Sequence, residues 1–156
     1  MLVFAWLAAA VVSVAAAPAA SAGAQPPTRN ERSFLRAVND ARMTRSLPPV
    51  LLVLPLENAA RFHSSDMVTR QYFAHGRFPA RVWEFGARDP IVGEDLGWSV
   101  DDGSATKRIV TMWLASPTHR AILLRRGFRY VGIGVSRGPF QGWLHAVVVT
   151  ADFEGN

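Results

Sequence analysis

The sequence predicts a single α+β domain, because helical and extended periodicities are interspersed along one chain of 156 residues. In some segments apolar residues recur with the spacing of an amphipathic helix, and in others they alternate as in a half-buried strand. The helical segments are 29–45, 55–70 and 104–114, and the extended ones are 91–98, 130–135 and 143–153.

The N-terminus has the composition of an export signal. Residues 2–17 are almost wholly apolar, and small residues then alternate up to Ala24 in the pattern that signal peptidases cleave. The apolar run is shorter than the about 20 residues of a membrane span, although an uncleaved anchor is the alternative. We therefore predict a secreted bacterial protein with no membrane span after cleavage. The expected boundaries are a signal peptide over 1–24, a linker over 25–28 and a folded domain over 29–156.

The chain carries a formal net charge of +5 and no cysteine. Disulfides therefore cannot hold the exported domain, which must rely on packing, or on packing and a metal. The cations are nearly all arginine and are scattered rather than clustered. They would suit an anionic cell wall, lipid head groups or nucleic acid. Because scattered cations are typical of a solvated surface, we expect no nucleic-acid partner.

The first two helices have clear signals in the sequence. Thr28 and Glu31 form a capping box at the start of the first helix, and Pro48-Pro49 follows its end. The second helix carries one apolar stripe along its length. His63 lies on that stripe, so we predict a core histidine that is hydrogen-bonded rather than a ligand.

Two candidate site residues, His75 and Glu94, flank a short helix expected over 79–85. His75 follows Tyr72-Phe73, where it would form the rim of a pocket or lie free in water. Glu94 alternates with apolar residues along its strand and shares their face. An inward carboxylate needs a partner, which a metal, a histidine or backbone donors would supply. Exposure at the strand end is the alternative.

A third candidate, His119, lies at a corner between two helices. The helix over 104–114 cannot continue through Pro117, whose ring removes a donor and crowds the preceding turn. Ser116 is a good N-cap and Pro117 a good first helical residue, so a new helix opens with His119 in its first turn. The alternative is a histidine that only hydrogen-bonds to the preceding turn.

Two strands joined by a turn close the chain. The first presents Gly132 and Gly134 on one face, where a helix or an aromatic ring could approach the backbone closely. Arg137-Gly138-Pro139 is the predicted turn, and the β-branched run after it is the predicted second strand.

His75, Glu94 and His119 would come together from a loop, a strand and a helix corner. Two imidazoles and one carboxylate can bind zinc and leave a position open for water, which is also a catalytic arrangement. The spacing alone is a weak signal for such a site. The sequence has no zinc-protease helix motif, no serine-hydrolase elbow and no phosphate-binding glycine loop.

Several groups of residues, taken in order, match the pattern of one known family. They are Val38 to Arg42 with Leu47-Pro48-Pro49; Ala60, His63, Ser64, Asp66 and Met67; Tyr72 to His75; Gly93 to Leu96; Trp113 to Arg120; Phe128 with Val131 to Val135; and Thr150 to Phe153. By their order and joint presence between Arg29 and Phe153, the chain resembles the CAP superfamily in its compact bacterial form. This superfamily comprises the cysteine-rich secretory, antigen 5 and pathogenesis-related 1 (SCP-like) proteins.

The resemblance implies a three-layer α-β-α sandwich, in which helices cover both faces of a small, mostly antiparallel sheet. It also implies a cleft lined by His75, Glu94 and His119, positions that the family associates with a divalent metal, usually zinc.

The chain departs from the family at two places near this cleft. Asp95 stands where the family usually has asparagine, and it adds a negative charge beside the cleft. Val148-Val149 stands where many relatives carry an aromatic residue or a histidine. His145 lies on the opposite strand face from Val148, so we do not assign it as a fourth ligand.

We expect a secreted, monomeric binding module. Its cleft would hold zinc or another divalent cation, and the adjacent groove would bind a lipid, a sterol-like or another cell-envelope ligand. The alternative is a metal-dependent, peptidase-like hydrolase, in which Glu94 would be a ligand or the general base. A third hypothesis is a cell-wall glycosidase that uses Glu94 with a second carboxylate such as Asp152.

Overall fold

The computed structural model describes residues 25–156, so the predicted signal peptide lies outside the described residues. Helices and strands alternate through this part of the chain. In order they are α1 (Arg29–Met43), β1 (Leu51–Leu52), α2 (Leu54–Arg70), α3 (Ala80–Glu84), β2 (Ile91–Val100), α4 (Ala105–Ala115), α5 (Pro117–Leu123), β3 (Phe128–Phe140) and β4 (Trp143–Gly155).

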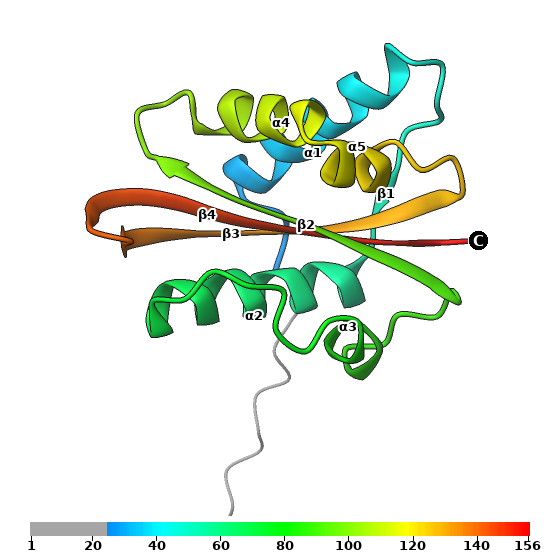
Figure 1. The fold of residues 1–156 in the computed structure, drawn as a ribbon. Coiled ribbons are helices and arrows are strands. Elements are labelled where there is room, and N and C mark those ends of the chain that lie inside the picture. Colours follow the sequence, from blue (N-terminus) through cyan, green and yellow to red (C-terminus); the bar gives the residue numbers. More distant parts are fainter. Residues whose placement is uncertain (1–24) are drawn as a thin grey trace, which may run out of the picture.

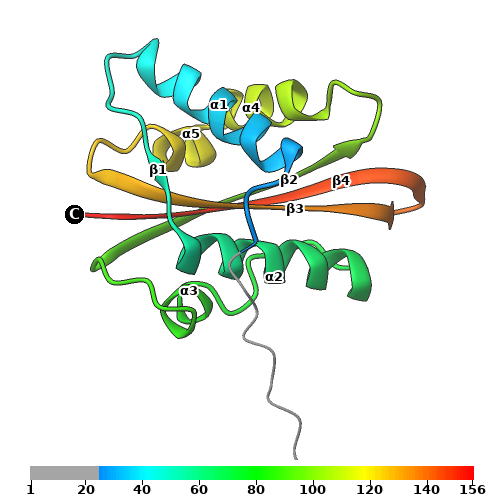
Figure 2. The same cartoon turned by 180° about the vertical axis from the view of Figure 1, so that it is seen from behind.

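The elements form the predicted three layers (Figure 1). Helices α1, α4 and α5 cover one face of the sheet, and α2 and α3 cover the other; Figure 2 shows the same layers from behind. The strand order is β1-β3-β4-β2. The long strands pair antiparallel and only the short β1 pairs parallel, with β3, so the sheet is mostly antiparallel as predicted. Strand β2 lies at an edge of the sheet.

Local signals in the sequence place the first two helices. The capping box at α1 forms as predicted, because the Glu31 N–H donates to Thr28 Oγ1 and the Thr28 N–H to Glu31 Oε2. Helix α2 lies directly on the glycine face of β3. A Cβ at Gly134 would lie 2.1 Å from the Ala60 carbonyl carbon, so only glycine allows this approach.

The larger core cluster lies between the sheet and the α1, α4 and α5 layer. Phe34 of α1, Ile109 and Trp113 of α4 and the inward residues of β3 and β4 are all buried in it. Trp113 also donates its indole N–H to the Leu96 carbonyl oxygen at 2.7 Å, which ties α4 to β2. This tie fixes the helix corner beside the edge strand.

The closing hairpin differs from its prediction. Residues 137–139 do not form the turn, because β3 continues through them to Phe140. A shift in register between Gly138 and Phe140 accommodates Pro139, which has no N–H for the ladder. The chain turns instead at Gln141 and Gly142, whose φ angles of 50° and 84° suit a tight hairpin.

Candidate functional site

The corner that carries His119 forms as predicted. Helix α4 ends at Ala115, Ser116 takes an extended conformation, and α5 begins at Pro117 with His119 in its first turn. The Ser116 side chain makes no capping hydrogen bond, however; its hydroxyl pairs with that of Thr118 at 3.1 Å. His119 is half-buried and faces the edge of the sheet near β2.

Glu94 points inward from β2, as the alternation of its strand predicted. Its side chain is 0% exposed, and Oε1 lies 2.6 Å from Nδ1 of His75, whose own side chain is 54% exposed. Of the partners considered from the sequence, the structure provides a histidine. His75 therefore links a buried carboxylate to solvent.

Arg81 is the residue of this site that the sequence did not indicate. Its guanidinium contacts the second oxygen of Glu94, and the same nitrogen lies 3.2 Å from Oδ1 of Asp152. Asp152 pairs across the sheet with Glu94, so the β2–β4 register brings these two carboxyl groups together. Burial, and then the charge of Glu94, raise the pKa of Asp152 well above its usual range. In the sequence, Arg81 is only one arginine in a short predicted helix, and this does not indicate a role in a site.

His63 is the buried core histidine that the α2 stripe predicted. Its Nε2 lies 3.0 Å from the Ala74 carbonyl oxygen, which fixes Nε2 as the donor of a neutral ring. Burial and the neighbouring Arg81 guanidinium lower its pKa and favour that neutral form. Its Nε2 is also 3.9 Å from Glu94, so His63 packs against the site without being exposed in it.

The pKa values of the two site histidines, His75 and His119, should shift in opposite directions from the ordinary value of 6.5. The hydrogen bond to Glu94 raises the pKa of His75, whereas burial and the nearby charge of His75 lower the pKa of His119. Because its pKa is raised, the charge on His75 stabilises the fold below pH 6.5, and this contribution is lost as pH rises through the folded-state pKa. NMR titration of the imidazole resonances should show this order. A pKa of His75 below that of His119 would contradict it.

The three predicted ligands do not gather around one point in the described part of the chain. Among residues 25–156, no three side chains of the metal-binding types gather around a common point. Both Glu94 oxygens are already engaged, one by His75 and the other by the Arg81 guanidinium. Within the described part of the chain, no hydrogen bond or ion pair joins His119 to His75 or to Glu94. A divalent cation at Glu94 would therefore have to compete with Arg81 and His75 for the carboxylate oxygens.

An apolar groove runs beside His119 along the open edge of β2. Its volume is about 420 Å³, and it is lined by the loop after α2, the middle of β2 and the α4–α5 corner. The exposed side chains of Phe73 and Met112 line it, together with Trp98 of the strand. The tryptophan N–H groups apart, Ser116 and His119 supply its polar side chains.

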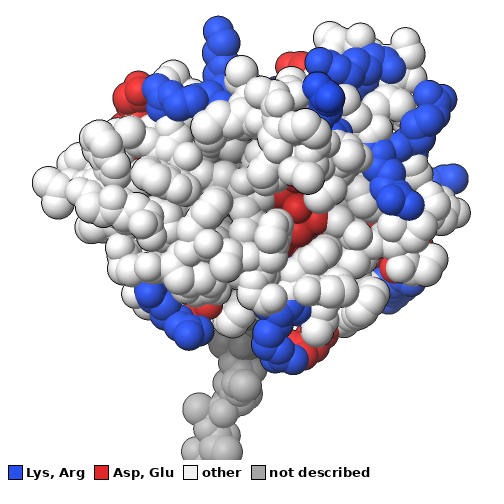
Figure 3. Space-filling model, viewed as in Figure 1, with Lys and Arg blue, Asp and Glu red and all other residues white. Residues whose placement is uncertain are grey.

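The surface around β2 is largely uncharged. Figure 3 shows acidic atoms in a hollow at the centre of this face, over β2, with basic residues confined to the periphery. Glu94 and Asp95 are the acidic residues of that strand. Both side chains are buried, so a ligand on this face would meet mainly apolar walls.

Asp152 cannot serve as the second carboxylate of a glycosidase. The structure does place it beside Glu94, as that hypothesis required, but its side chain is 0% exposed. A carboxyl group that water cannot reach cannot flank a glycosidic bond.

The fold and this edge site define a class of protein: an α-β-α sandwich with a buried glutamate beneath an exposed histidine at an edge strand. The model of the cysteine-rich secretory protein (CAP) family matches residues 35–153. The chain therefore belongs to this family.

Relatives and solved structures agree with this assignment. The chain is 30% identical over 115 residues to the uncharacterized membrane protein YlbC of Bacillus subtilis, with 70% of the chain aligned, but it spans only 32% of that protein's length. An extracellular protein containing an SCP domain from Bacillus anthracis superposes with a TM-score of 0.66 at 21% identity, over 85% of this chain and 45% of that one. An outer surface protein of Borrelia burgdorferi gives 0.64 at 18% identity, over 84% and 97%. These two structures show the fold alone.

None of the helices within residues 25–156 combines the length and the apolar character needed to cross a membrane.

Proposed function

We propose that this chain is an extracytoplasmic binding module that holds an apolar ligand in the groove along β2. The observation that carries the proposal is the groove itself, where Phe73 and Met112 remain 41% and 45% exposed around a cavity of about 420 Å³. Exposed apolar side chains gathered around one cavity indicate a binding surface, because burying them against a ligand is favourable.

The polar groups of the site would orient this ligand rather than react with it. His119 lies in the groove lining, and the loop that carries His75 supplies Phe73 to the same lining. A ligand with an apolar body and one polar group would place that group near these imidazoles. A lipid or another envelope component has this chemistry, which agrees with the predicted export of the chain.

Binding of the uncharged fluorescent probe N-phenyl-1-naphthylamine tests the groove. Met112→Glu places a charge in the groove at an exposed position, so we expect at least tenfold weaker binding without loss of the fold. Leu144→Glu is the matched control, because Leu144 is 76% exposed on β4 and outside the groove lining. Equal binding by wild type and Met112→Glu would exclude this groove as the ligand site.

Metal binding by His75, Glu94 and His119 stays a prediction with its own test. Calorimetric titration with zinc should compare wild type with His75→Ala and His119→Ala, and with His145→Ala as the control at an exposed histidine. Loss of binding in the first two variants alone would support the metal site. Equal binding by all four proteins would reject it. The hydrolase alternative depends on the same ion and would be tested with a peptide and ester panel in its presence.

A further inference from the structure

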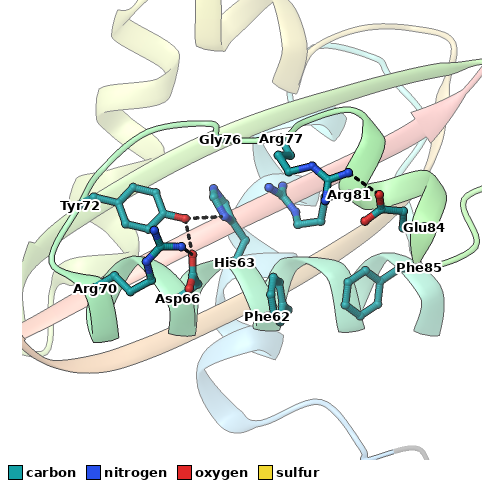
Figure 4. A pocket seen from close by; sticks show the side chains of 10 residues that line it. All are labelled: Phe62, His63, Asp66, Arg70, Tyr72, Gly76, Arg77, Arg81, Glu84 and Phe85. Carbon is teal, nitrogen blue, oxygen red and sulfur yellow. Dashed lines mark hydrogen bonds and ion pairs between the residues drawn. The ribbon is translucent and has the colours of Figure 1, made fainter.

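A second cavity lies on the other side of the loop that carries His75. It has a volume of about 430 Å³ and is formed by α2, residues 72–77 and α3 (Figure 4). We call it the α2–α3 pocket. Tyr72 and Gly76 line this pocket while Phe73 lines the β2 groove, so one loop separates two cavities of different character.

Two exposed aromatic rings form an apolar wall of the α2–α3 pocket. Phe62 of α2 is 55% exposed and Phe85, just after α3, is 38% exposed. Their ring centroids are 5.7 Å apart and their planes meet at 42°. Figure 4 shows the two rings next to each other along α2. Together they offer a platform on which a flat apolar face could pack.

Charged groups of both signs surround this platform in pairs. Arg77 donates to Glu84 at 2.6 Å, and Arg70 lies 3.5 Å from Asp66. The side chains of Arg70 and Arg77 are 70% and 77% exposed, so these pairs are weak and can open to admit a ligand. The rim thus presents hydrogen-bond donors and acceptors side by side with little net charge.

The floor of the pocket holds an acceptor that lacks a well-placed donor. Because His63 Nε2 donates to the Ala74 carbonyl oxygen, Nδ1 must be an acceptor in the neutral ring. The nearest group is the Tyr72 hydroxyl at 3.5 Å, but that hydroxyl donates to Asp66 Oδ2 at 2.6 Å. A contact of 3.5 Å is at the limit of a hydrogen bond. A ligand donor reaching the floor would therefore find buried Nδ1 available.

We propose that the α2–α3 pocket binds one ring of an uncharged saccharide. A sugar ring has an apolar face that can pack on Phe62 and Phe85, and its hydroxyls both donate and accept. Each hydroxyl could bridge a guanidinium and a carboxylate of the rim, which neither an anion nor a hydrocarbon can do. An anion would have to displace Asp66 and Glu84 from the exposed guanidinium groups they pair with, and a hydrocarbon would leave the charges of these pairs desolvated. The proposal is independent of the β2 groove.

Titration with maltotriose and N,N′,N″-triacetylchitotriose, followed by ¹⁵N NMR, tests the pocket, with benzoate as a planar anionic probe. We expect one of the two saccharides to shift amide resonances around Phe62, Arg77 and Phe85, and benzoate to bind more weakly. Phe62→Ala should weaken saccharide binding at least tenfold while keeping the melting temperature, because Phe62 is largely exposed.

Phe73→Ala is the matched control, since Phe73 is also an exposed phenylalanine but lines the other cavity. It should leave saccharide binding unchanged and weaken N-phenyl-1-naphthylamine binding, so the two sites fail or succeed separately. Three results would each overturn the proposal: no binding of either saccharide at about 20 mM, a concentration that would reveal millimolar affinity; equal saccharide binding by Phe62→Ala and the wild type; or tighter binding of benzoate than of the saccharides.

Discussion

Replacing Arg42 by alanine should destabilise the fold by about 3 kcal/mol or more. The Arg42 side chain is fully buried, and its guanidinium donates to four backbone carbonyl oxygens, those of Pro48, Leu123, Arg125 and Phe128, at 2.8 to 3.1 Å. These carbonyls belong to the segment after α1 and to the stretch from the last residue of α5 to the first of β3. Alanine would remove one donor from each of these oxygens and would open a cavity among them.

Urea unfolding followed by circular dichroism would measure this loss. Arg36→Ala is the control, because Arg36 lies on the same helix but is exposed, and it should change stability by less than about 0.5 kcal/mol. Arg42→Lys should recover only part of the lost stability, since one ammonium group cannot reach all four carbonyl oxygens that the planar guanidinium contacts. A cost for Arg42→Ala no larger than that of Arg36→Ala would show that the four contacts contribute little.

Asp95→Asn should stabilise the protein at pH 8 and flatten its dependence on pH. Asp95 is fully buried on β2, and neither carboxyl oxygen has a hydrogen-bond partner. Its neighbours on that face of the strand are Gly93 and Gly97, which pack against apolar side chains. Burial, with a smaller contribution from the charge of Glu94, raises the pKa of Asp95 from 3.8 to about 8.

The sign of the effect follows from this raised pKa. Between about pH 4 and pH 8 the folded state keeps a proton on Asp95 that the unfolded state has lost, so stability falls as pH rises. The slope approaches about 1.4 kcal/mol per pH unit, and below pH 4 the group contributes no penalty. Asparagine has no proton to lose, so the wild-type protein and the variant should differ most at pH 8.

Urea unfolding at a series of pH values would test this, with Asp40→Asn as the control at an exposed carboxyl group. The Asp40→Asn curve should run parallel to that of the wild type. If the stability of Asp95→Asn depended on pH as steeply as that of the wild type, the buried carboxyl group would not be the source of the slope.

Short-range patterns in the sequence determined most of the secondary structure. The capping box at Thr28, the stop at Pro117 and the glycine face of β3 each describe a physical constraint between residues that are near in the chain, and each was confirmed. The turn predicted at residues 137–139 was wrong. Gly138 and Pro139 lie instead in an irregular part of β3, which only the pairing of β3 with β4 reveals.

The sequence by itself also determined that Glu94 points inward and that His119 occupies a helix corner, because the period of a strand and the geometry of proline are local properties. Only the tertiary structure decided what surrounds Glu94. Arg81 and Asp152 come from a short helix and from the neighbouring strand, 13 and 58 positions away in the sequence. The contacts of a buried charge depend on register and packing between remote segments, and no periodicity within one segment specifies them.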